Sequence, residues 1–104
     1  MSEFFENDYG IFAWDGDKNT VNINKHGISF EEASEVFSDD NAIFNIDTIH
    51  SYAEERFIII GLSKISRVLT VCYCERKNGD IIRIISARKA TTKEKNLYGG
   101  QAWQ

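Results

Sequence analysis

The sequence of 104 residues contains no proline, only two cysteines and no apolar run that could cross a membrane. With no proline, no repeats and no low-complexity stretch, nothing marks a linker, so we expect a single domain over residues 1–104. A transmembrane helix needs about 20 apolar residues, whereas the longest apolar run here is FIIIGL at 57–62. The first residues, MSEFFENDYG, are acidic, whereas a secretory signal begins with basic residues and continues with an apolar centre. A cytoplasmic protein with no membrane partner is therefore expected.

Potential metal ligands are also scarce, because the only cysteines and histidines are Cys72, Cys74, His26 and His50. A structural zinc site usually draws on two separate pairs of ligands, which a lone C-x-C does not supply. Neighbours on one face of a strand are also too far apart for good disulfide geometry. Catalysis by a Cys–His pair needs a histidine that the sequence cannot place beside either thiol. We therefore expect reduced cysteines that pack in the core, and no metal or cofactor.

Charge is distributed unevenly along the chain, although the net charge is only −4. Residues 1–55 carry 13 acidic and 2 basic side chains, whereas residues 56–104 carry 3 acidic and 10 basic ones. A local basic surface, rather than the net charge, governs contact with a phosphate backbone. The two halves either neutralise each other in the fold or present a basic surface to a polyanion, and both interpretations stay open at this point.

The first part of the chain predicts a strand followed by two helices. A short strand at 11–14 leads into a helix at 16–26, with Asp15 as its N-cap and Gly27 as its C-cap. A stripe of Asn19, Asn22, Ile23 and His26 on this helix is too polar for a core seam. It indicates a solvent-exposed face, a face that buries amides in hydrogen bonds, or part of a site.

Further elements follow from capping boxes and turn formers. The capping box SFEE at 29–32 begins a second helix, and a short strand is expected at 42–46. After the central strands, the capping box TTKE at 91–94 begins a helix that ends at Tyr98. The ends of the chain, 1–10 and 99–104, are expected to be loosely ordered.

Three apolar runs between Arg56 and Lys89 predict a meander of antiparallel strands. The last two runs are joined by Asn78-Gly79, a strong signal for a two-residue hairpin turn. Regular pairing from this turn predicts the pairs Cys74–Arg83, Cys72–Ile85, Val71–Ser86 and Leu69–Arg88. The predicted fold is therefore α+β, a small antiparallel sheet with a central three-stranded meander, two N-terminal helices and a C-terminal helix.

Basic side chains lie at the ends and edges of these strands. The group comprises Arg56, Arg67, Arg76, Lys77, Arg83, Arg88 and Lys89. Such a surface suits RNA cleavage, in which a 2′-hydroxyl attacks the adjacent phosphate with a base, a stabilising cation and an acid, and which requires no metal. Glu75, His26 or Tyr73 could move the protons. A solvated sheet edge is the simpler interpretation, and regular pairing places Arg56 far from Arg88.

Several motifs together resemble the BrnT toxin family. They are FAWD at 12–15, N-x-x-K-H-G-x-S-F at 22–30 with Lys18 and Asn19 before it, ERF at 55–57, GL at 61–62, and RIISARKA at 83–90 followed by Lys93 and Glu94. The resemblance covers about residues 12–98, and it is the combination in this order that is specific.

This resemblance implies a bacterial type II toxin with a RelE-like fold, a metal-independent endoribonuclease that cleaves RNA and inhibits translation. It implies neutralisation by a BrnA-like ribbon-helix-helix antitoxin in a heterotetramer, which contacts operator DNA only through the antitoxin. The charged positions shared with the family are Lys18, Lys25, His26, Arg56 and Arg88.

When the charged residues of the predicted strands are added to these shared positions, the expected site comprises two groups of residues. The catalytic candidates are Arg56, Arg88, His26 and Glu75. The RNA-binding candidates are Lys18, Lys25, Arg67, Arg83 and Lys89. The alternatives are a non-catalytic binding module that docks an acidic partner, and a decayed toxin that acts only in a regulatory complex with its antitoxin.

Overall fold

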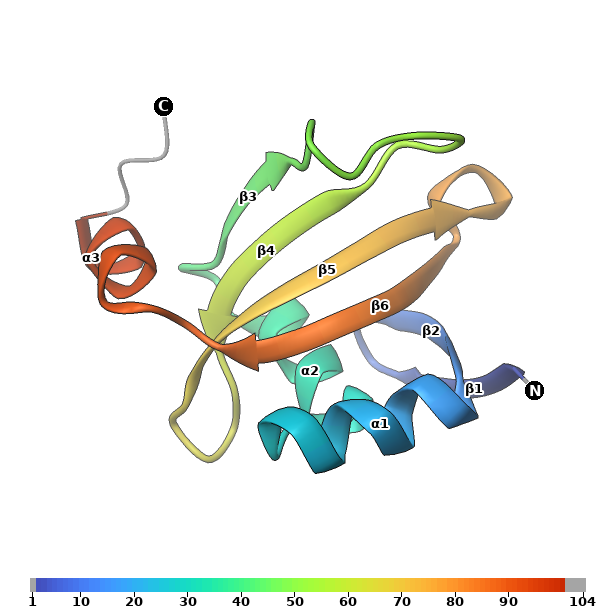
Figure 1. Cartoon of the computed structure of the whole chain (residues 1–104), viewed down its shortest axis with the longest axis horizontal. Helices are drawn as coiled ribbons and strands as arrows, with labels where there is room; N and C mark the ends of the chain where they lie inside the picture. Colours follow the sequence, from blue (N-terminus) through green and yellow to red (C-terminus); the bar gives the residue numbers. More distant parts are fainter. Residues whose placement is uncertain (1, 101–104) are drawn as a thin grey trace.

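The computed structural model describes residues 2–100 and contains one mixed sheet with three α-helices (Figure 1). The strands are β1 (Ser2–Asn7), β2 (Gly10–Asp15), β3 (Ile43–Ile46), β4 (Phe57–Leu62), β5 (Val68–Arg76) and β6 (Ile81–Lys89). The helices are α1 (Gly16–His26), α2 (Phe30–Ser34) and α3 (Thr92–Gly100), with 3-10 turns η1 (Glu35–Ser38) and η2 (Lys77–Gly79). The order of strands in the sheet is β1-β2-β6-β5-β4-β3.

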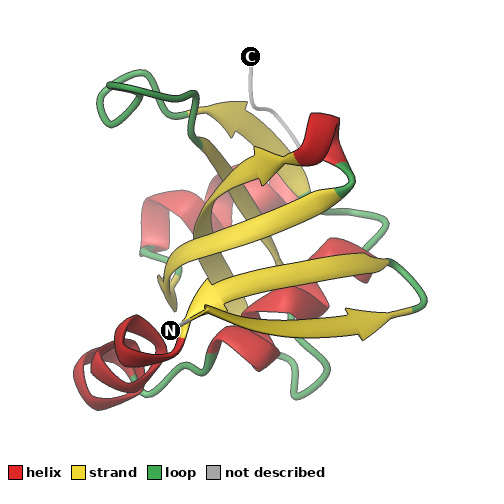
Figure 2. Ribbon diagram, turned by 90° about the vertical axis from the view of Figure 1, so that its right-hand side faces the viewer, coloured by secondary structure: helices red, strands yellow, loops and turns green. Residues whose placement is uncertain are grey.

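The predicted meander is the centre of this sheet, but the sheet is larger and not purely antiparallel. β4, β5 and β6 pair antiparallel as expected. In addition, β2 pairs parallel to β6 over Ile11–Ala13 and Ile81–Arg83. The helices α1 and α2 lie in the connection between β2 and the meander, and the second and last strands of the fold, β2 and β6, become neighbours. Figure 2 shows the twist of the whole sheet.

The N-terminal residues form a strand, which differs from the loose extension expected for 1–10. β1 pairs with β2 along its whole length, from Ser2 opposite Asp15 to Asn7 opposite Gly10. The indole nitrogen of Trp14 donates a hydrogen bond to the Glu3 carboxylate at 2.8 Å, and the ring of Phe5 lies 6.3 Å from that of Trp14. These contacts fix β1 to the fold.

One face of the sheet carries the core, and α2 and η1 cover it (Figure 1). Its members include Phe12, Trp14, Ile28, Phe30, Ala33, Val36, Ile59, Leu69, Val71, Tyr73, Ile84 and Ala87. Because Leu69, Val71 and Tyr73 alternate along β5, the residues between them, Thr70 and Cys72, point to the opposite face. That opposite face carries the candidate site.

The caps that the sequence predicts for α1, and the predicted N-cap of α2, are present in the structure. Asp15 caps α1 through the amides of Asp17 and Lys18, and Gly27 ends it with φ of 71°. Ser29 accepts a hydrogen bond from the Glu32 amide at 3.0 Å. α2 itself is only five residues long and continues as the turn η1.

The second predicted capping box is complete. The Thr91 hydroxyl accepts from the Glu94 amide at 3.1 Å, and the Glu94 carboxylate accepts from the Thr91 amide at 2.8 Å. α3 runs beyond the predicted end at Tyr98 and includes Gly99 and Gly100. The rest of the predicted tail, 101–104, lies outside the described residues.

A bulge in β6 changes the predicted register. The Asn78-Gly79 turn has the expected positive φ values of 59° and 91°, and Cys74 faces Arg83 as predicted. Beyond Tyr73 and Ile84, Ile85 is an extra residue. The observed pairs are therefore Cys72–Ser86, Val71–Ala87, Thr70–Arg88 and Leu69–Lys89. The predicted pairs Cys72–Ile85, Val71–Ser86 and Leu69–Arg88 are wrong by one residue.

Candidate functional site

The bulge places Arg88 on the uncovered face of the sheet, together with Arg56. Regular pairing would set Arg88 opposite Leu69, on the core side, whereas the shifted register sets it opposite Thr70. Arg56 immediately precedes β4, and both arginines line one hollow of about 230 Å³. The expectation that these two residues lie far apart was therefore wrong. Asp47, His50 and Cys72 line the same hollow.

Arg88 is held in place by the first turn of α3. Its guanidinium donates to the two carboxylate oxygens of Glu94 at 2.7 and 3.0 Å. Burial of Glu94 opposes its ionisation, but hydrogen bonds from Arg88, the Thr91 amide and the Thr70 hydroxyl outweigh burial and lower its pKa to about 2. The Arg88 side chain stays 42% exposed, so a face of its guanidinium remains open to an anion.

Arg56 has a fixed backbone and an uncommitted head group. Its amide donates to the Ser51 hydroxyl at 2.9 Å, and its carbonyl accepts from the Asp47 amide at 2.8 Å. Among residues 2–100, its guanidinium forms no hydrogen bond or ion pair that meets ordinary distance limits. A charged donor with no internal acceptor is suited to an external anion.

Cys72, in the same hollow, is a protonated thiol at neutral pH. Burial and the nearby Asp47 carboxylate raise its pKa to about 11, and the positive charge of Arg56 only partly opposes this. Burial also raises the pKa of Cys74. Neither cysteine therefore supplies a thiolate nucleophile.

Sequence reasoning missed the pair of Asp47 and His50, because it considered His50 only as a possible metal ligand and then excluded a metal site. The Asp47 carboxylate accepts from the His50 amide at 3.3 Å and contacts the ring nitrogen Nδ1 at 2.8 Å. Asp47 is 7% exposed. The spacing D-x-x-H after a strand is the signal that could have indicated this turn.

A second hollow, of about 320 Å³, adjoins the first across the bulge. It is lined by Lys18, Lys25 and His26 of α1, and it shares Ile85 and Ser86 with the first hollow. The helix that carried the polar stripe is therefore the second wall of the site. The two hollows together bring five of the predicted residues to one region.

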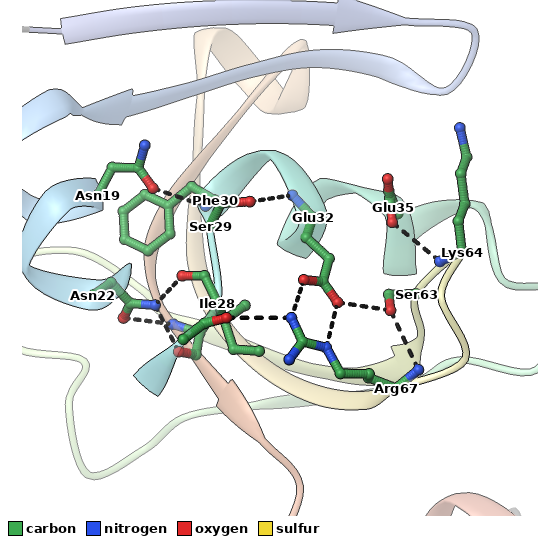
Figure 3. A network of polar contacts seen from close by, with 12 residues as sticks. Asn19, Asn22, Ile28, Ser29, Phe30, Glu32, Glu35, Ser63, Lys64 and Arg67 are labelled. Carbon is green, nitrogen blue, oxygen red and sulfur yellow. Dashed lines mark hydrogen bonds and ion pairs between the residues drawn. The ribbon is translucent and has the colours of Figure 1, made fainter. Parts of the chain in front are cut away.

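Buried amides attach α1 to β6. The Asn22 side-chain nitrogen donates to the carbonyls of Ile28 and Ala87, both at 2.8 Å, and its oxygen accepts from the Ala87 amide at 3.2 Å (Figure 3). Asn22 thus pairs with the edge of β6 in place of a strand. Asn19 accepts from the Phe30 amide at 2.9 Å. Of the interpretations of the polar stripe, burial of amides is confirmed.

Arg67 lies away from this region and serves the structure. Its guanidinium binds the Glu32 carboxylate through two nitrogens and donates to the Gly27 carbonyl at 3.2 Å (Figure 3). The bond from Arg67 lowers the pKa of Glu32 despite partial burial, and the Ser63 hydroxyl contributes. Lys89 lines a separate hollow beside Arg67.

Glu75 and Arg83 also lie outside the two hollows. Glu75 shares its face of β5 with the core residue Tyr73 and lines a hollow with Glu54 and Glu55 at the hairpin end. The structure therefore does not bring Glu75 to Arg56 and Arg88. Arg83 lies on the same face as Cys74, with Ser2 3.4 Å from its guanidinium.

The described residues contain no cluster of three or more His, Cys, Asp or Glu side chains suited to a metal ion. Within residues 2–100, no helix has the length and apolar character needed to span a membrane.

Comparison with solved structures defines the class of fold. The chain is similar to the crystal structure of the Brucella abortus ribonuclease toxin BrnT, with a TM-score of 0.58 and 23% identity over 76% of this chain and 94% of that chain. No curated protein matches the sequence.

The sequence itself gives the family. Residues 14–94 match the family described as the ribonuclease toxin, BrnT, of type II toxin-antitoxin systems. The chain belongs to this BrnT family, which confirms the resemblance found in its motifs.

Proposed function

We propose that this chain is a metal-independent endoribonuclease that cleaves RNA at the open face of its sheet and inhibits translation in the cytoplasm. The observation that carries the proposal is the meeting of Arg56 and Arg88, 32 positions apart in the sequence, in one hollow beside Lys18, Lys25 and His26. Membership of a ribonuclease toxin family supports it.

The two arginines have complementary roles in the proposed reaction. Arg56 has an uncommitted guanidinium and binds the scissile phosphate, while Arg88 is pre-oriented by Glu94 and stabilises the charge of the phosphorane. The ribose 2′-oxygen bonds to phosphorus, the bond from phosphorus to the 5′-oxygen breaks, and a 2′,3′-cyclic phosphate and a 5′-hydroxyl form. Two proton transfers complete the reaction without any metal or co-reactant.

The second hollow receives the flanking RNA. Lys18 and Lys25 bind neighbouring phosphates, and His26, at the end of α1, protonates the leaving 5′-oxygen. Arg83 extends the basic track along the same face. Glu75 is left out of this mechanism because it belongs to another hollow, and Arg67 and Lys89 are peripheral to it.

The proposed partner is a BrnA-like ribbon-helix-helix antitoxin. It neutralises the toxin in a heterotetramer, and the complex contacts operator DNA only through the antitoxin. Membership of a type II toxin-antitoxin family supports an antitoxin partner.

The test compares Arg56→Ala and Arg88→Ala with the wild type and with Lys64→Ala, which removes one positive charge from an exposed loop. Purified proteins are incubated with bacterial RNA in EDTA, and antitoxin binding and growth on induction are measured in parallel. We expect both arginine variants to lose cleavage and toxicity by about 10²-fold or more, with antitoxin binding and the Lys64→Ala variant unchanged. Arginine variants that lose antitoxin binding, beside a wild type that leaves the RNA uncut, would favour a non-catalytic binding module. A wild type that is harmless and leaves RNA intact would indicate a decayed toxin.

A further inference from the structure

The hollow that contains Arg56 and Arg88 also holds an oriented histidine. We infer that His50 is the general base that removes the proton from the attacking 2′-hydroxyl, and that Asp47 positions it. This inference rests on the proposed ribonuclease function and assigns a proton-transfer residue to it.

Asp47 is held rigidly at the end of β3. Its amide donates to the Arg56 carbonyl at 2.8 Å, so the position of Asp47 is tied to the backbone of a phosphate-binding arginine. Its carboxylate accepts from both the amide and the Nδ1 of His50, at 3.3 and 2.8 Å. Two bonds to one residue fix both the backbone and the ring of that histidine.

The contact at Nδ1 sets which nitrogen can act as a base. A carboxylate accepts hydrogen bonds only, so the neutral imidazole carries its proton on Nδ1 and its lone pair on Nε2. Among residues 2–100, Nε2 forms no hydrogen bond, and the His50 side chain is 56% exposed.

The surroundings of His50 suit proton removal beside a phosphate. Arg56 and Arg88 line the same hollow and attract the phosphate, and Cys72 presents a protonated thiol. Tyr52 and Glu54, from the same loop, line an adjoining hollow together with His50 and Arg56.

The proton balance of the reaction then uses both histidines of the chain. His26 lines the other hollow, beyond the Ile85-Ser86 segment that the two hollows share. His50 takes the 2′-hydroxyl proton and His26 gives a proton to the 5′-oxygen, so no proton is gained or lost. Water returns both groups to their starting states.

The simpler interpretation is that the contact between Asp47 and His50 only stabilises the loop before β4. His50→Asn separates the two interpretations, because an asparagine amide can replace the Nδ1 donor to Asp47 but offers no Nε2 lone pair. Ile49→Ala, in the same loop and 74% exposed, is the matched control.

The experiment measures kcat and KM of each variant on an RNA oligonucleotide and on a ribonucleoside 3′-(4-nitrophenyl phosphate), whose leaving group needs no acid. We expect His50→Asn to lower kcat about 10²- to 10⁴-fold on both substrates. The variant should also lose the rise of rate with pH. Its affinity for a 2′-deoxy oligonucleotide and its urea midpoint should not change. His26→Asn should be impaired on RNA but nearly normal on the nitrophenyl ester.

Two outcomes would overturn the inference in different ways. If the wild type cleaves RNA, Arg88→Ala does not and His50→Asn cleaves like the wild type, the base assignment fails while the proposed function stands. If His50→Asn lowers the affinity for the 2′-deoxy oligonucleotide and the urea midpoint together with kcat, His50 only stabilises its loop and is not the base. A wild type that cleaves neither substrate would overturn both the inference and the proposed function.

Discussion

Replacing Asn22 by alanine should destabilise the protein strongly although the residue lies on a polar helix. Its amide satisfies three backbone groups, namely the carbonyls of Ile28 and Ala87 and the amide of Ala87. Ile28 and Ala87 are buried, with exposed fractions of 0% and 1%. In the alanine variant these groups lose their partners in a place that water reaches poorly.

The expected loss follows from the number of bonds. At about 1 kcal/mol for each intramolecular hydrogen bond, Asn22→Ala costs about 3 kcal/mol in the free energy of unfolding. That is a large part of the roughly 5–15 kcal/mol of a small domain. Asn22→Asp should cost more at pH 7, because its carboxylate would face two carbonyl oxygens, and should recover partly in acid, where a protonated carboxyl can donate once.

Urea unfolding followed by far-ultraviolet circular dichroism measures this loss. Asn24→Ala, on the exposed side of the same helix, is the control and should stay within about 0.5 kcal/mol of the wild type. An Asn22→Ala variant as stable as the Asn24→Ala variant would refute the view that Asn22 attaches α1 to β6.

Three further predictions concern stability. Glu94 has a folded pKa of about 2 against an ordinary 4.5, so its contribution is present above about pH 4.5 and lost as pH falls toward 2. Glu94→Gln should cost about 1–2 kcal/mol at pH 7, with allowance for solvent screening, and little at pH 2.5 in urea titrations. Gly61→Ala should cost about 1–3 kcal/mol by calorimetry, because its Cβ would lie 3.0 Å from the Val36 Cβ. Arg67→Lys should lower the urea midpoint but leave RNA cleavage unchanged, since a lysine cannot bind both oxygens of Glu32.

Local chemistry made several elements predictable from the sequence. Both ends of α1, the turn at Asn78-Gly79 and the capping box from Thr91 to Glu94 depend on residues within four positions of each other. The resemblance in the motifs had singled out Lys18, Lys25 and His26, and these three residues line the second hollow. Short-range signals of this kind do not require the tertiary structure.

The features that the sequence did not predict depend on contacts between distant segments of the chain. The parallel pairing of β2 with β6 joins residues about 70 positions apart and has no local signal. The bulge at Ile85 involves neither glycine nor proline, so regular alternation was the natural assumption and Arg88 was placed on the wrong side. Asp47 and His50 were not predicted as a pair, because only the fold sets their loop beside the arginines.

The extra residue at Ile85 affects how β6 tolerates changes of length. Loss of Ile85 would leave the pairs Cys72–Ser86 and Thr70–Arg88 in register as a regular ladder, so the arginine would keep its side. Gain of a residue between Ser86 and Arg88 would instead turn the guanidinium toward the core. In related chains, one-residue deletions should therefore be tolerated here and insertions rejected.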